Sequence, residues 1–334
     1  MGKDKRETES ISRGNVLRKS EEVEGAIVKG YDFGNGVDYD KILDSYMATG
    51  FQATHFAKAV DIIRKMTAEK ATIFLGASSN LITSGVRDVI RYLVEKKKID
   101  VFVTTAGGIE EDIIKCLGDF KIGKFSESGE LLRQEGINRT GNILIPNSRY
   151  VEFEKFLTPI LNKIYEEQKK TGKIISVSEF IKMLGKKINN KESILYWAWK
   201  NDVKVFCPAI TDGSMGDMMH FFMYKHPDFK VDIASDIHEL NEFTITRKKT
   251  GLIILGKGMM KHHILNSNMM RNGADYAVYI NSGEEWDGGG SNARPDEAVS
   301  WGKVGSDGKG EAIKVFGDAT ILFPLIVAKT FAGN

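Results

Sequence analysis

The chain has 334 residues, of which 42% are hydrophobic and 28% charged, proportions that fit a folded globular protein rather than a disordered one. No stretch approaches the roughly 20 apolar residues that a membrane helix needs, and the net charge of +2 gives no electrostatic reason to expect nucleic acid or anionic lipid. The only two cysteines, Cys116 and Cys207, argue against a disulfide framework and favour a reducing, cytoplasmic location.

The first 25 residues differ in composition from the rest of the chain. They are rich in Lys, Arg, Glu and Ser and lack a sustained apolar period. We therefore expect residues 1–25 to form a flexible, solvated arm. The alternative is a segment that docks on a neighbour or over a site. Residues 26–334 are expected to form a single domain.

Regular elements begin near residue 55. Apolar residues recur at helical spacing over 56–66 and again over 86–94. Compact apolar runs at 72–77 and 100–105 predict buried strands, and a further helix is predicted near 109–117. Helices that alternate with wholly apolar strands indicate a parallel sheet that is covered on both faces.

The same pattern continues to the end of the chain. Further strands are predicted at 203–207, 252–255, 276–280 and 313–316, and helices at 150–169, 192–201, 260–272 and 319–331. The sequence therefore predicts an α/β fold with a doubly wound, mainly parallel, Rossmann-like sheet and a helical N-terminal portion.

Two loops rich in small residues follow the first two predicted strands, at 76–85 and 104–108. Ligands bind beyond the carboxyl ends of the strands in such sheets, and N–H groups at a helix start can hold phosphate. Neither loop contains the G-x-G-x-x-G fingerprint of dinucleotide-binding proteins. A nucleotide site and ordinary turn chemistry both remain open at this point.

The segment 211–217 follows another predicted strand and carries two carboxylates, Asp212 and Asp217, on a connection with two glycines. An Asp-Gly turn would explain either residue alone, whereas the pair after a buried strand favours a site. His262 and His263 are adjacent on a predicted helix, so they point in different directions and at most one faces a given site. We expect no metal there, because no carboxylate or cysteine pattern accompanies them.

The stretch 283–303 has the most unusual composition. It holds five carboxylates and two of the four tryptophans, Trp286 and Trp301, and it ends in Lys303. Carboxylates beside aromatic faces suit an organic cation, although an acidic surface loop with tryptophan anchors has the same composition. A lysine that loses its solvation beside an aromatic ring can become nucleophilic.

These segments together resemble the deoxyhypusine synthase family. The resemblance is colinear from about residue 25 to the end and is carried by residues 79–82, 103–112, 136–139, 211–214, 261–263, 270–280 and 293–303. It implies the deoxyhypusine synthase type of the doubly wound fold already predicted. It also implies that residues 26–334 form a single NAD-binding catalytic domain.

The resemblance also implies a reaction. NAD takes a hydride from spermidine, and the aminobutyl group of the resulting imine passes to an enzyme lysine with release of 1,3-diaminopropane. The group then moves to a lysine of the hypusine-bearing translation factor precursor and is reduced by the retained NADH. Family members are homotetramers with active sites shared between subunits, and their N-terminal segment can cover a neighbour's entrance.

Individual roles follow from the resemblance. Lys303 would form the imine and Trp301 would flank the spermidine chain. Asp217 and Glu297 would hold ammonium groups, and His262 would bind the polyamine and take a proton. The remaining polyamine contacts would come from Glu110, Glu111, Gly288 and Gly289. The NAD contacts would be Ser79, Asn80, Leu81, Ile82, Thr83, Thr105, Ala106, Gly107, Glu111, Asp212, Ser282, Gly283, Asp318 and Ala319. No metal is expected.

Two positions depart from the family pattern. Gly290 stands where the family usually has an acidic residue that binds one end of spermidine, and Lys257 interrupts a run of three glycines. Two alternatives therefore stay open: a homospermidine synthase, which uses putrescine as acceptor, and a weakly active paralogue that is the structural partner of an active subunit. Because a free lysine has a pKa of about 10.4, we expect imine formation to be fastest at alkaline pH.

Overall fold

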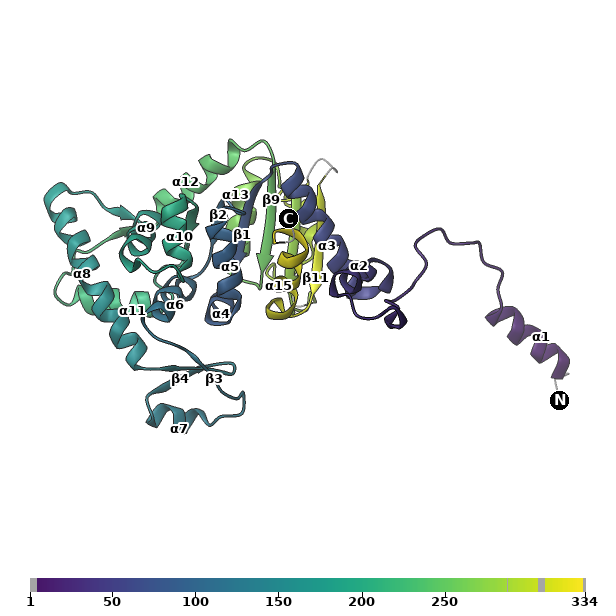
Figure 1. Ribbon diagram of the computed structural model, residues 1–334. Coiled ribbons are helices and arrows are strands. Elements are labelled where there is room, and N and C mark those ends of the chain that lie inside the picture. Colours follow the sequence, from purple (N-terminus) through teal and green to yellow (C-terminus); the bar gives the residue numbers. More distant parts are fainter. Residues whose placement is uncertain (1–4, 287, 306–309, 333–334) are drawn as a thin grey trace.

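The computed structural model describes residues 5–286, 288–305 and 310–332. Its centre is a six-stranded, wholly parallel sheet in the order β11-β10-β9-β1-β2-β7 (Figure 1). The strands are β1 (Thr72–Ala77), β2 (Val101–Val103), β7 (Lys204–Phe206), β9 (Thr250–Leu255), β10 (Tyr276–Asn281) and β11 (Glu311–Phe316). The chain starts in the middle, builds outward to β7, then returns to build outward to β11. This is the strand order of doubly wound dinucleotide-binding folds, and its switch point lies between β1 and β9.

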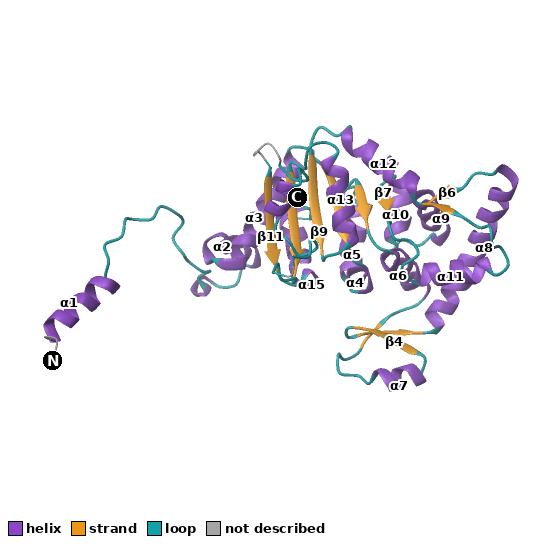
Figure 2. Cartoon of the chain, turned by 180° about the vertical axis from the view of Figure 1, so that it is seen from behind, coloured by secondary structure: helices purple, strands orange, loops and turns teal. Residues whose placement is uncertain are grey.

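Helices cover both faces of this sheet. One face carries α3 (Phe51–Ala68), α5 (Val86–Glu95), α9 (Val177–Ile188), α10 (Ile194–Asn201) and α15 (Ala319–Thr330). The other carries α12 (Ala234–Ile245), α13 (Met259–Met269) and α14 (Pro295–Ser300) (Figure 2). The fold class expected from the sequence is therefore confirmed.

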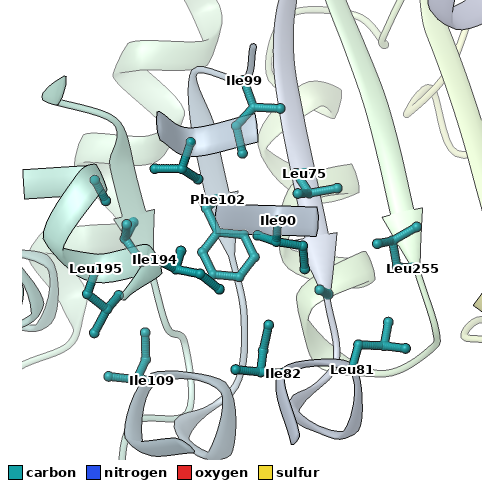
Figure 3. Packing of buried hydrophobic residues seen from close by; sticks show 14 of the residues in the cluster. Leu75, Leu81, Ile82, Ile90, Ile99, Phe102, Ile109, Ile194, Leu195 and Leu255 are labelled. Carbon is teal, nitrogen blue, oxygen red and sulfur yellow. The ribbon is translucent and has the colours of Figure 1, made fainter. Parts of the chain in front are cut away.

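Alternation along the strands divides the core into two layers. Ile73, Leu75 and Ala77 of β1 pack on the α5 side, together with Phe102 and Leu255 (Figure 3). The intervening strand residues, such as Phe74 of β1, pack against α13 on the opposite side. Because both faces are buried, these strands are apolar at every position rather than at alternate ones, which is why their sequences are continuous apolar runs.

The remaining elements are smaller or lie beyond the sheet. Shorter helices are α1 (Lys5–Val16), η1 (Phe33–Asn35), α2 (Tyr39–Thr49), α4 (Ser79–Thr83), α6 (Ala106–Leu117), α7 (Gly129–Gln134) and α11 (Ser214–Met223), and α8 (Ser148–Thr171) is the longest described helix. A three-stranded antiparallel sheet contains β3 (Lys121–Ile122), β4 (Ile137–Thr140) and β5 (Ile143–Pro146), and a two-stranded sheet contains β6 (Ile175–Ser176) and β8 (Val231–Asp232). None of the described helices is long and apolar enough to cross a membrane.

Two local predictions need correction. The helix expected over 260–272 ends at Met269, because Asn272 and Gly273 take positive φ angles of 69° and 100° and turn the chain toward β10. The connection expected at 211–217 includes the first turn of α11, which starts at Ser214. Gly216 permits this start, since a Cβ there would lie 2.1 Å from the carbonyl oxygen of Thr211.

The N-terminal segment extends away from the domain (Figure 1). Residues 5–16 form α1, in which no side chain is buried, and an extended stretch leads from it to α2. The sequence predicted a flexible, solvated arm over 1–25 and gave no sign of the helix α1. The flexibility of this arm and the single catalytic domain at 26–334 stay predictions.

The open edge of the sheet at β11 is occupied by side chains of α3. Gln52 accepts a hydrogen bond from the backbone N–H of Phe316 through Oε1 at 2.7 Å. His55 Nδ1 lies 3.0 Å from the carbonyl oxygen of Lys314. Backbone groups that an edge strand usually leaves unpaired are thereby satisfied within the chain.

Candidate active site

Two of the predicted NAD loops meet at the carboxyl edge of the sheet. Arrowheads in Figures 1 and 2 point toward the edge where α4 and α6 begin. Neither helix has a side-chain hydrogen bond at its N-cap, Ser78 or Thr105, so the first-turn N–H groups can bind a ligand. Gly107 lets the two helices approach, since a Cβ there would lie 2.7 Å from the Cβ of Ser79. This edge can hold the phosphates of a dinucleotide.

Two buried carboxylates on α6 link this helix to its neighbours α11 and α4 at the edge of the sheet. Glu110 accepts hydrogen bonds from the backbone N–H groups of Ser214 and Met215 at the start of α11. Glu111 accepts one from the hydroxyl of Thr83. Burial raises the pKa of both carboxyls, and that of Glu111 reaches about 7 with a further contribution from the negative charge of Glu110.

The other residues predicted for this region lie at the same edge. Asp212 precedes α11 and Asp217 occupies its first turn; both are exposed and raise the pKa of Glu110 further through their charges. Ser282 and Gly283 follow β10, while Asp318 and Ala319 begin α15 after β11. We call the edge residues 79–83, 105–111, 212 and 217 the dinucleotide half of the candidate site.

Lys303 lines a separate cavity of about 570 Å³ between α13 and α14. Its side chain is largely buried, and its Nζ lies 5.3 Å from the ring of Trp301. His262 and Glu297 line the same cavity, as do Gly290 and Ser291. We call this cavity the lysine half of the site. It places an amine beside an aromatic face, a carboxylate and an imidazole.

The two adjacent histidines separate as their spacing predicts. His262 lines the Lys303 cavity, with its Nδ1 at 3.1 Å from Nδ2 of Asn266, whereas His263 lines a different and smaller cavity beside Cys207. Burial and the positive charge of Lys303 lower the pKa of His262. The ring is therefore mainly neutral near pH 7 and can accept a proton. No cluster of three or more potential metal ligands occurs among the described residues.

The acidic stretch 283–303 does not converge on one cavity. Glu297 and Trp301 line the Lys303 cavity, but Glu284, Glu285, Trp286 and Asp296 line another cavity of about 670 Å³ beside β11. Gly288 and Gly289 are exposed and line neither, and Asp287 lies outside the described residues. The carboxylates and tryptophans of this stretch therefore divide between two cavities, and each cavity contains both kinds of side chain.

The two halves of the candidate site are distinct within one chain. The backbone carbonyl oxygen of Lys303 accepts a hydrogen bond from the N–H of Ala274, just before β10 begins, while Gly258 and Met259, which follow β9, line another side of its cavity. None of Glu110, Glu111, Asp212 and Asp217 lines the Lys303 cavity. On the cavity side, His262, Glu297 and Trp301 are exposed, so the lysine half is open in the single chain.

Comparison with known proteins decides what this arrangement belongs to. The family model described as deoxyhypusine synthase matches residues 41–330. A deoxyhypusine synthase of Senecio vernalis is 50% identical over 96% of this chain and 94% of its own. The crystal structure of a putative deoxyhypusine synthase from Entamoeba histolytica matches with a TM-score of 0.68 and 35% identity, covering 91% of this chain and 97% of that one.

The chain belongs to the deoxyhypusine synthase family. The resemblance inferred from the sequence is therefore confirmed, and the chain is an enzyme of the transferase class. The family includes a close alternative activity, since homospermidine synthase 2 of Senecio vernalis is 48% identical over 99% of this chain and 97% of its own.

The two departures from the deoxyhypusine synthase pattern lie on different loops. A Cβ at Gly290 would have only Oε1 of Glu297 nearby, at 3.9 Å, so the position has room for a side chain. Lys257 is exposed on the loop after β9, at the switch point, between two glycines with positive φ angles of 81° and 112°.

Two lysines of the site were not predicted from the sequence to have roles of their own. Lys261 and Lys115 are partly or wholly buried lysines that each donate to three backbone carbonyls. Lys261 lies in a segment that carries the family resemblance, but the residue pattern gives no sign of its partners. Lys115 belongs to the predicted helix near 109–117 and had no signal beyond helical spacing.

Proposed function

We propose that the chain is an NAD-dependent deoxyhypusine synthase that transfers the aminobutyl group of spermidine to a lysine of the hypusine-bearing translation factor precursor. The observation that carries this proposal is the amine of Lys303, buried beside Trp301 in a cavity with a carboxylate and a neutral imidazole. Attack on a carbon–nitrogen double bond requires a nucleophilic amine, and the largely buried side chain of Lys303 brings one to this cavity.

The remaining residues of the lysine half have complementary roles in this proposal. Trp301 covers the aliphatic chain of the polyamine and attracts its cationic groups. Glu297 binds an ammonium group. His262 takes the proton from the secondary amine, because its lowered pKa leaves the ring neutral near pH 7.

The dinucleotide half fits NAD. The open N–H groups of α4 and α6 suit its phosphates, and Gly107 lets the two helix starts lie close together. Glu111 beside Thr83 suits a ribose hydroxyl. When bound, NAD supplies the hydride acceptor for spermidine oxidation and, in reduced form, the hydride donor.

The division of the site supports assembly into a homotetramer with shared active sites. The exposed walls of the Lys303 cavity lack the four carboxylates of the dinucleotide half, so a second subunit that brings such a half to the cavity would complete the site. The N-terminal segment, which extends away from the domain, is the part of the chain that would cover a neighbour's entrance. Both cysteines are free, which supports a cytoplasmic location.

The test uses the full chain with NAD and spermidine labelled in its aminobutyl group. Borohydride reduction should trap label on the parent protein, and mass spectrometry should place it on Lys303. Addition of the precursor protein should move the label to one precursor lysine. Failure to trap label on the parent would refute the proposal.

Homospermidine synthase remains the second candidate, because members with this activity match almost the full chain. The same preparation, given putrescine in place of the precursor protein, distinguishes the two. Formation of homospermidine with no mass gain on the precursor would assign the second activity. Trapping only in the presence of another subunit would assign the chain as a structural partner.

A further inference from the structure

One wall of the Lys303 cavity is an irregular loop that joins β10 to α14. Its residues Gly290, Ser291 and Ala293 line the cavity directly. No strand and no helix lies between Asn281 and Pro295 among the described residues, so backbone hydrogen bonding alone does not fix this wall. Something else must hold it in place, because a cavity wall can orient a flexible polyamine only if it is itself fixed.

Lys261 in the first turn of α13 binds this loop through its backbone carbonyl oxygens. Its Nζ donates to the carbonyl oxygens of Gly290, Ser291 and Ala293 at 2.9, 3.1 and 3.1 Å. The ammonium group also lies 4.5 Å from the centre of the Tyr279 ring, and only 2% of the residue is exposed. The three N–H donors of an ammonium group thus meet three acceptors on one loop.

This geometry distinguishes Lys261 from Lys303. Burial lowers the pKa of Lys261 to about 8, an effect to which the charge of Lys314 contributes. The three carbonyl oxygens nevertheless favour the charged form and take all of its hydrogens, so the amine offers no lone pair for attack. Burying a lysine without a carboxylate partner is costly, and the hydrogen bonds to the loop are what compensate.

We propose that Lys261 is a positioning residue that fixes the wall 290–293 against α13. The fixed wall then holds the polyamine at the position where the amine of Lys303 can react with it. This inference rests on the proposed function of the cavity. His262 follows Lys261 directly, so one turn of α13 both carries an imidazole into the cavity and anchors the wall beside it.

The chain contains a matched control for this role. Lys115 donates to the carbonyl oxygens of Ile82, Thr83 and Ser84 at 3.0, 3.0 and 2.8 Å, at the end of α4 in the dinucleotide half. Two lysines therefore make the same kind of contact, each with three consecutive or nearly consecutive carbonyls, but in different halves of the site.

The experiment compares Lys261→Met with Lys115→Met in the full chain. Lys261→Met should raise the KM for spermidine in the trapping assay by about tenfold, equivalent to about 1.4 kcal/mol, while the Kd for NAD stays at the parental value. Lys115→Met should weaken NAD binding, which Lys261→Met should not. Lys261→Arg, which keeps the charge but not the three-way geometry, should fall between Lys261→Met and the parent.

Hydrogen exchange on the free protein tests the wall without any turnover. Lys261→Met should speed the exchange of amides in 289–294 and leave those of α4 unchanged. Equal losses of both ligands in the two lysine variants, or unchanged exchange in 289–294, would overturn the positioning role. If the parent traps no spermidine, the proposed function fails, whereas the exchange result still decides whether Lys261 holds the loop.

Discussion

The two halves of the candidate site hold their binding groups in place by different structural means. The dinucleotide half consists of helix starts at the ends of strands, so its N–H donors come from the fold itself. The lysine half lies between α13, the six-residue helix α14 and the loop before α14, and side chains such as Lys261 fix that loop. A site built on regular elements needs few dedicated residues, whereas one built on a loop needs an anchor for each free stretch of backbone.

Lys303→Ala should produce the largest effect and separate the halves most clearly. The variant should trap no labelled aminobutyl group above background, because no other described lysine of the cavity has a free amine. NAD binding, followed by calorimetry, should remain at the parental level. Label trapped on Lys303→Ala at the parental level would mean that the chemistry does not reside in the lysine half.

Glu111→Gln should reveal the free-energy cost of burying a charged carboxylate in the dinucleotide half. The raised pKa lets the folded state keep a proton that the unfolded chain loses between pH 4.5 and about 7, so the free energy of unfolding falls as pH rises through this window. The variant should lack this fall and be more stable than the parent above pH 7 by up to about 3 kcal/mol. Denaturant unfolding at several pH values measures the difference, which should vanish below pH 4.5.

Gly107→Ala should damage the dinucleotide half alone. Its Cβ would lie 2.7 Å from that of Ser79, so α4 and α6 must separate and NAD binding should weaken by about ten- to a hundredfold. Gly129→Ala is the matched control, because nothing lies within 4 Å of a Cβ at that helical position. A parental NAD affinity in Gly107→Ala would show that the close approach of these helices is not needed.

Gly290→Asp should produce the smallest effect and act on the lysine half. The position has room for a side chain beside Glu297, and a second carboxylate there should lower the KM for spermidine by about two- to fivefold, as expected for an exposed ion pair. Gly290→Asn keeps the shape without the charge and should leave KM unchanged. The gain should shrink as salt is added, and a gain shared by both variants would exclude a charge effect.

The same contrast explains what could be predicted from the sequence. The central strands were predictable because burial on both faces makes each one a continuous apolar run. The helix α11 was missed because Gly213 and Gly216, which usually break helices, allow close contacts there with Glu110 and Thr211. The short strands β3 to β6 and β8 contain two to four residues each, too few for any period to emerge.

The roles of individual residues also differed in how far they could be predicted from the sequence. Lys303 and His262 could be named in advance because the family resemblance points to them, and the structure places both in one cavity. The roles of Lys261 and Lys115 depend on carbonyl oxygens brought to them by the tertiary fold, which no residue pattern records. The acidic stretch 283–303 divides between two cavities because α14 turns its two sides toward different neighbours.

The contacts of Gln52 and His55 with β11 limit how this molecule can join others. An exposed strand edge invites another chain to extend the sheet, which is also the first step of uncontrolled fibrous growth. Here two side chains already occupy backbone positions that an incoming strand would need. An incoming strand could therefore extend the sheet at β11 only by displacing Gln52 and His55, so this edge offers no free template for growth.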